Sequence, residues 1–179
     1  MRGAGHTLIE LVIVIVIIGV LAAFVAPILT ETVSSYDTTA RNVELLGQMR
    51  YAMDRMSREM RQMRRELTNP ANYDISTMTS TKLVFVATDG NQVTIDNTTL
   101  SSEVALGYTA PAASATLTDS VKAAGFTFTY CRVDGTTCAT STGATVDKSN
   151  VAFVQVDMTL TGSGTGDYVS TMRVDLKNP

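Results

Sequence analysis

The N-terminal part of the chain contains an apolar run long enough to cross a membrane. Residues Leu11 to Thr30 carry no charge, and only Gly19 and Pro27 interrupt a run rich in Val, Ile and Leu. Twenty helical residues, at about 1.5 Å each, span about 30 Å, the thickness of a bilayer's hydrocarbon core. The run therefore predicts a transmembrane helix. Arg2 is the only charge before Glu10, so the short N-terminus is expected to stay in the cytoplasm.

Two simpler interpretations of this run are a cleaved secretory signal and an uncleaved signal anchor. A cleaved secretory signal has a short apolar core followed by a small-residue cleavage site, whereas here Ala22-Ala23 is followed by apolar residues up to Leu29. An uncleaved signal anchor explains the run but not Glu10. An ionisable group at the edge of a membrane segment is costly and is usually functional. The alternative for Glu10 is a position among the lipid headgroups without a special role.

A second pattern predicts that the helix continues as an amphipathic segment. Apolar residues recur at spacings of 4, 3, 4, 3 and 4, which places them on one face of a helix: Met49, Met53, Met56, Met60, Met63 and Leu67. Asn69-Pro70 is a stop signal, so the helix is expected to end near Leu67. We expect this methionine face to pack on a sheet. A soft groove for a partner is the alternative.

Beyond Pro70 the pattern changes to short β-type runs, which together with the helix predicts an α+β fold. Asp89-Gly90 is typical of a hairpin turn, and Gly162 to Gly166 reads as a flexible turn. The Ala/Thr/Ser-rich segment 97–124 is left without an assignment. The expected strands are Thr81–Thr88, Gln92–Ile95, Phe126–Cys131, Val151–Leu160 and Tyr168–Leu176.

The two cysteines are placed to form a small disulfide ring. Asp134-Gly135 lies midway between Cys131 and Cys138, and a hairpin turn there puts the two cysteines opposite each other, within the spacing that a disulfide accepts. Export to an oxidising compartment favours the bond. Two free thiols or a redox site are the alternatives.

Charge is distributed unevenly along the chain, whose formal net charge is −3. Residues 41–66 contain seven Arg and four acids, while residues 68–179 contain six Lys or Arg and ten acids. The basic stem could attract acidic heads of neighbours or anionic lipid, or it could simply be a solvated helix face. A sequence pI near 5.1 gives no support for nucleic acid as a primary partner.

An enzyme is the main rival class of function. The only histidine is His6, so histidine-based catalytic and metal sites are not expected in the β-rich part. Asp89, Asn91, Asp96 and Asn97 offer oxygen ligands for calcium, but the EF-hand pattern is absent from the sequence and turn chemistry explains them better. We expect no enzymatic activity, no metal and no cofactor.

The N-terminus resembles a known signal. Met1-Arg2-Gly3-Ala4-Gly5 followed by His6-Thr7-Leu8-Ile9-Glu10 is similar to the class III leader of type IV prepilins and type II secretion pseudopilins. The resemblance implies cleavage after Gly5 by a prepilin peptidase, N-methylation of His6, pairing of Glu10 with the methylated ammonium of a neighbouring subunit, and a helix kink at Pro27. The first mature residue is usually Phe, so His6 is a departure from the pattern.

The arginine-rich stem, from Gln48 to Arg61, resembles more loosely the stem of minor pilins of the PilW type, the MSHA-type minor protein O and the J-type minor pseudopilin. The patterns Phe126 to Tyr130 and Met172 to Asn178 are similar to the same group. The small cysteine ring departs from the larger C-terminal loop that cysteines often bracket in major pilins.

The resemblance implies a pilin-like fold: a long helix, transmembrane then amphipathic, packed on an antiparallel β-sheet head. The expected segments are a leader at 1–5, a transmembrane and assembly helix at 6–30, an amphipathic helix at 31–67 and a periplasmic or extracellular head at 68–179.

The function implied is a minor pilin-like subunit, held in the inner membrane by a single span before it enters an extracellular or periplasmic filament. Its expected partners are other pilin subunits, the prepilin peptidase, the inner membrane and the pilus assembly machinery. A major pilin and a type II secretion pseudopilin are alternatives within the family. A membrane-anchored periplasmic binding module that never assembles is the alternative outside it.

Overall fold

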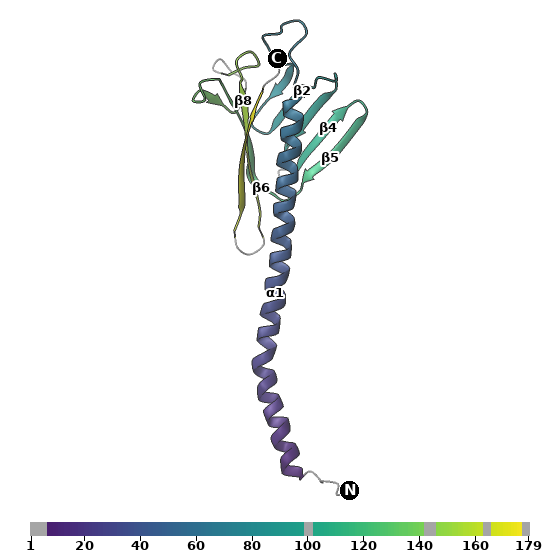
Figure 1. Cartoon of the computed structure of the whole chain (residues 1–179), viewed down its shortest axis with the longest axis vertical. Coiled ribbons are helices and arrows are strands. Elements are labelled where there is room, and N and C mark those ends of the chain that lie inside the picture. The colour runs from purple at the N-terminus through teal and green to yellow at the C-terminus, as the bar shows by residue number, and fades with distance from the viewer. Residues whose placement is uncertain (1–6, 99–101, 142–145, 163–165, 177–179) are drawn as a thin grey trace. The chain divides into compact units, whose positions relative to one another are not determined.

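The computed structural model describes residues 7–98, 102–141, 146–162 and 166–176. Within these ranges one helix, α1, is followed by nine strands, β1 to β9 (Figure 1). Contacts divide the chain into a first unit that ends at Arg41 and a second unit that starts at Asn42. The first unit contains only part of α1, and the second contains the rest of α1 and all nine strands.

Helix α1 extends from Leu8 to Arg61, and its apolar part is bare in the isolated chain. Every residue from Leu8 to Asp37 is exposed. By length and composition α1 is able to cross a membrane. The helix continues through Pro27, where Thr30 Oγ1 donates a hydrogen bond to the carbonyl of Ala26 at 3.0 Å. The predicted kink stays a prediction.

In the second unit the methionine face of α1 is buried, as its spacing predicted. Met49, Met53, Met56 and Met60 all join the core of the head. The expected extension of the helix to about Leu67 is wrong, because α1 ends at Arg61. Leu67 is 80% exposed and is not part of the buried face.

The helix ends where its backbone begins to pair with the strands. Met63 forms a β-bridge with Ala87 and Arg65 forms one with Tyr73. The Arg64 amide donates to the Val86 carbonyl at 3.0 Å, a bond that an uninterrupted helix would direct to its own preceding turn. Met63 therefore stays buried in an extended conformation, which the spacing of apolar residues could not distinguish from a helix.

The first sheet is antiparallel and has the strand order β1-β2-β3-β4-β5. Gly90 lies in the predicted turn between β2 and β3 with φ of 88°, a left-handed conformation that suits glycine. Strands β4 and β5 lie in the segment that the sequence left unassigned, and β1 was also missed. The strands are β1 (Ile75–Met78), β2 (Lys82–Val86), β3 (Gln92–Asp96), β4 (Val104–Thr109) and β5 (Ala112–Thr118).

The second sheet is also antiparallel and has the order β7-β6-β8-β9. Its three long strands correspond to the last three strands predicted from the sequence, although β6 begins at Val121 rather than Phe126. The strands are β6 (Val121–Cys131), β7 (Cys138–Ala139), β8 (Phe153–Leu160) and β9 (Tyr168–Asp175).

A bulge explains the early part of β6. Val121 pairs with Leu160, but the next pair is Phe126 with Met158, so β6 contains extra residues between them. A Cβ atom on Gly125 would lie 2.8 Å from the Lys122 carbonyl oxygen and 2.9 Å from that of Thr159. The bulge therefore needs glycine at this position.

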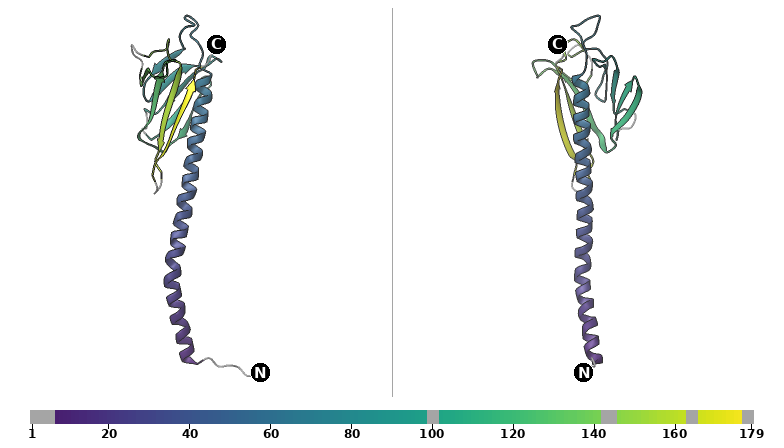
Figure 2. Two further views of the ribbon diagram at one scale, coloured as in Figure 1. Left: turned by 60° about the vertical axis from the view of Figure 1, so that its left-hand side comes forward. Right: turned by 45° about the vertical axis from the view of Figure 1, so that its right-hand side comes forward.

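Both sheets and the methionine face share one core. Figure 2 shows the C-terminal part of α1 beside the strands of the second unit. Phe126 packs edge-on against Phe128 with ring centroids 4.9 Å apart, and Tyr130 follows on the same face of β6. The Tyr130 hydroxyl donates to the Thr79 carbonyl at 2.8 Å, and burial raises its pKa. The fold is α+β, with one long helix packed on antiparallel sheets.

We expect Met56→Ala to lower the free energy of unfolding of the head by about 2–5 kcal/mol, because Met56 is fully buried and truncation leaves a cavity. Leu67→Ala is the matched control, and its effect should stay within about 0.5 kcal/mol. Denaturant titration of the detergent-solubilised protein, followed by near-ultraviolet circular dichroism, measures both. Equal losses for the two variants would contradict the packing described.

Candidate functional site

The first turn of α1 positions Glu10. The Thr7 carbonyl accepts hydrogen bonds from the amides of Glu10 at 3.0 Å and Leu11 at 3.3 Å. In return the Thr7 amide donates to Glu10 Oε2 at 3.4 Å. This return bond is one half of a capping box, in which the third helical residue reaches back to the amide of the cap. The sequence contains the matching spacing in Thr7-Leu8-Ile9-Glu10, but its importance was missed.

The capping position gives Glu10 a local role in addition to any role between subunits. A carboxylate at the start of a helix is stabilised by the partial positive charge of the unpaired amides. The side chain is also exposed in the isolated chain, so a cation from another molecule has access to it. Gly5 and His6, the expected cleavage and methylation positions, lie outside the described residues.

The predicted site residues of α1 lie far apart along the helix. Pro27 lies seventeen positions after Glu10, which corresponds to about 25 Å along α1. Cys131 and Cys138 belong to the second unit. Any assembly role of the N-terminal segment is therefore spread along the helix and is not concentrated in a pocket.

A partly buried polar cluster joins α1 to the first sheet. Glu59 is only 6% exposed, and its Oε1 lies 2.9 Å from Arg55 Nη2. The Tyr108 hydroxyl donates to Glu59 Oε1 at 2.7 Å and accepts from Arg55 Nη2 at 2.6 Å. Burial, and then the bond to Glu59, raises the pKa of Tyr108. These directional bonds set the rotation of α1 on β4, which a face of flexible methionines does not do.

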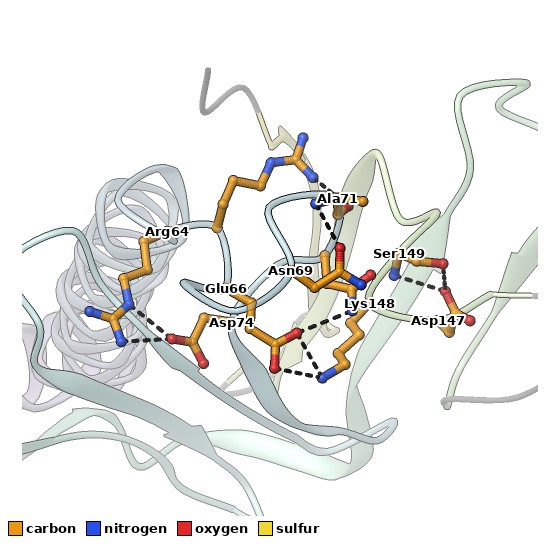
Figure 3. Close-up of polar contacts among 10 residues, drawn as sticks. Arg64, Glu66, Asn69, Ala71, Asp74, Asp147, Lys148 and Ser149 are labelled. Carbon is orange, nitrogen blue, oxygen red and sulfur yellow. Dashed lines mark hydrogen bonds and ion pairs between the residues drawn. The ribbon is translucent and has the colours of Figure 1, made fainter.

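The segment after α1 is held by a second polar cluster, which Figure 3 shows. Arg64 points toward Asp74 with its Nη2 2.8 Å from the carboxylate. Glu66 accepts a hydrogen bond from Asn72 at 3.1 Å and pairs with Lys148 at 3.2 Å. The Asn72 bond, followed by that of Lys148, lowers the pKa of Glu66. The cluster ties the start of the head to the loop before β8.

Cys131 and Cys138 form a disulfide across the β6–β7 hairpin. They are direct partners in the register, with Cα atoms 4.1 Å apart, as the hairpin argument predicted. Asp134 caps the turn by accepting hydrogen bonds from the amides of Thr136 at 3.0 Å and Thr137 at 2.9 Å.

The oxygen atoms considered as calcium ligands take part in turn contacts. Asp89 Oδ1 accepts from the Asn91 amide at 2.9 Å. Asp96 pairs with Lys82 at 2.9 Å and accepts from the Thr98 amide at 2.7 Å. These contacts favour the turn interpretation over a calcium site.

Replacing both cysteines by serine should lower the free energy of unfolding by about 2 kcal/mol, because the bond closes a short loop of the unfolded chain. Thiol labelling of the unreduced, exported protein checks the bond directly, with a reduced sample as the control. Two reactive thiols in the unreduced protein would refute the disulfide.

Comparison with known proteins identifies the N-terminal segment. Residues 1–26 match the family model of the prokaryotic N-terminal methylation motif. Neither a curated protein nor a solved structure matches the chain. The matched range includes Gly5, His6 and Glu10, and such a signal implies processing by a prepilin peptidase and assembly with pilus machinery. The chain therefore carries the N-terminal signal of the type IV pilin and pseudopilin family, joined to an α+β head.

Proposed function

We propose that this chain is a minor pilin-like structural subunit of a type IV pilus or related filament. The observation that carries the proposal is the methylation motif at residues 1–26, continued by a helix whose apolar side chains from Leu8 to Leu29 are all exposed. In this proposal the precursor is held in the inner membrane by α1, loses residues 1–5 and then joins a filament.

The exposed helix supports assembly, because its apolar surface can be buried only against lipid or another molecule. Removing a large aliphatic side chain from water is favourable by about 1.5–3 kcal/mol, and the run Leu8 to Leu29 presents many such side chains. A bilayer covers them before assembly. Once the subunit leaves the bilayer, helices of neighbouring subunits offer an equivalent apolar surface.

Glu10 gives this packing a register. Within a bundle of apolar helices a carboxylate loses its water and needs a cationic partner. We propose that the methylated ammonium of His6 in a neighbouring subunit supplies that partner. The capping bond from Thr7 is compatible with this pairing, because a carboxylate can accept several hydrogen bonds at once.

The minor role is supported by the arginine-rich stem and by the strand patterns that resemble minor pilins. A major pilin and a type II secretion pseudopilin use the same N-terminal chemistry and are the alternatives. We also propose a structural and not a catalytic role for the head, since the single histidine of the chain is His6.

Gly5→Val should block processing, because a branched side chain next to the cut site hinders approach of the peptidase to the backbone. The wild-type protein should begin at His6 with a methylated amino terminus. Intact-mass analysis of membrane and filament fractions reads both forms. Assembled wild-type protein that still contains residues 1–5 would contradict this proposal.

Glu10→Ala should leave membrane insertion intact and lower filament incorporation, because the ammonium of a neighbour loses its counter-charge. Stranding a buried charge costs about 3–5 kcal/mol. Glu10→Gln should be intermediate in effect, since it keeps the acceptor for the Thr7 amide but not the charge. The measurement is the amount of subunit in sheared filaments relative to that in membranes.

Glu31→Ala is the matched control, because Glu31 is exposed on the same helix just beyond the apolar run, and it should enter filaments like the wild type. If Glu10→Gln assembled fully while Glu10→Ala did not, capping and not the ion pair would explain Glu10. If Glu10→Ala also assembled fully, Glu10 would not be the residue that sets the register. Absence of the wild-type protein from sheared filaments would instead favour the membrane-anchored module.

A further inference from the structure

A groove of about 660 Å³ lies where β6 and β9 end and β8 begins. Three arginines from separate parts of the chain line it: Arg65 after α1, Arg132 after β6 and Arg173 in β9. The groove has no role in the proposed assembly mechanism, which involves only the N-terminal helix. A convergence of guanidinium groups is a basis for binding an oxyanion.

Two of the guanidinium groups are held in place by aromatic rings. The Arg65 guanidinium carbon lies 3.8 Å from the centroid of the Tyr73 ring, and that of Arg173 lies 3.5 Å from the centroid of Phe153. Both rings are buried, with exposed fractions of 2% and 4%. Such stacking limits the side-chain freedom that a ligand would otherwise have to remove.

The backbone of the third arginine, Arg132, is held by the disulfide-bonded hairpin. Arg132 follows the disulfide-bonded Cys131, and its amide donates to the Thr137 carbonyl at 3.0 Å across the hairpin. Among the described residues, no hydrogen bond or ion pair engages the Arg132 guanidinium, although its charge acts on the carboxylates of Asp134 and Asp147. Its donors are therefore available to a ligand.

The carboxylates beside the groove are already engaged. Asp134 caps its own turn, and the hydrogen bonds of Thr137 lower its pKa. Asp175 accepts from Arg173 Nε at 3.2 Å, and Asp147 accepts from the Ser149 amide at 2.8 Å. Three Arg against two Asp leave the lining with a formal charge of +1.

We propose that this groove binds the carboxylate groups of an acidic polypeptide segment from another protein. Arginine forks match carboxylates in shape and charge. A peptide is favoured over a nucleic acid because the lining adds an exposed apolar side chain to the arginines. Val133, which is 88% exposed on the rim, offers an apolar contact that a peptide side chain can use.

The test is fluorescence anisotropy with full-length protein in an uncharged detergent and a labelled, end-capped hexaglutamate peptide at low salt. Arg132→Gln should weaken binding several-fold, and the Arg132→Gln/Arg173→Gln pair at least tenfold. Capped hexaglutamine should not bind. Arg50→Gln is the control, because Arg50 is an exposed arginine on α1 outside the groove, and it should bind hexaglutamate like the wild type.

Arg132→Gln alone keeps the stacking of Arg173 on Phe153, and an unchanged near-ultraviolet circular dichroism spectrum checks that its head is intact. Hexaglutamate affinity that is unchanged in both arginine variants would overturn the proposal. Tighter binding of a six-nucleotide oligothymidylate that depends on the same arginines would also overturn it, in favour of nucleic acid.

Discussion

The structure depends on one constraint: the N-terminal part of α1 carries apolar side chains that the described chain does not cover. From Leu8 to Asp37 every residue is exposed, whereas from Met49 to Met60 the same helix buries its methionine face in the head. One end of the helix is therefore covered within the chain, and the other presents exposed apolar surface that is long enough to cross a membrane. The methylation motif, the long charge-free run and the carboxylate of Glu10 all lie at this exposed end.

The head packs against α1 through flexible methionine side chains. Flexible methionines bury apolar area but do not fix the rotation of the helix about its axis. The hydrogen bonds of the Arg55–Glu59–Tyr108 cluster fix that rotation at one side of the face. The polar contacts of Arg64 and Glu66 then hold the segment that leaves the helix. In the hairpin the disulfide and the Asp134 cap restrict the chain that presents Arg132. The groove we propose as a binding site thus rests on elements that also stabilise the head.

Sequence patterns predicted the features that follow from local periodicity or turn chemistry. These include the apolar helix, most of the methionine face, the Asp89-Gly90 turn and the cysteine hairpin. The end of α1 was not predictable from spacing, since Met63 is buried through a bridge to Ala87 and not through a helical turn. Strands β4 and β5 were missed because small Ala, Gly, Ser and Thr side chains carry a weak strand signal. As a result Tyr108, the partner of the Arg55–Glu59 pair, also escaped notice. The arginine groove joins residues far apart in the chain, which no local pattern reveals.

The central claim is that the same helix surface changes its cover from lipid to other subunits. A photo-cross-linking amino acid at Val20, in the middle of the apolar run, tests this directly in membranes and in sheared filaments. The account predicts lipid adducts in the membrane fraction, and covalent adducts with a second pilin-type subunit in the filament fraction. Lipid adducts alone, together with absence of the protein from filaments, would contradict it.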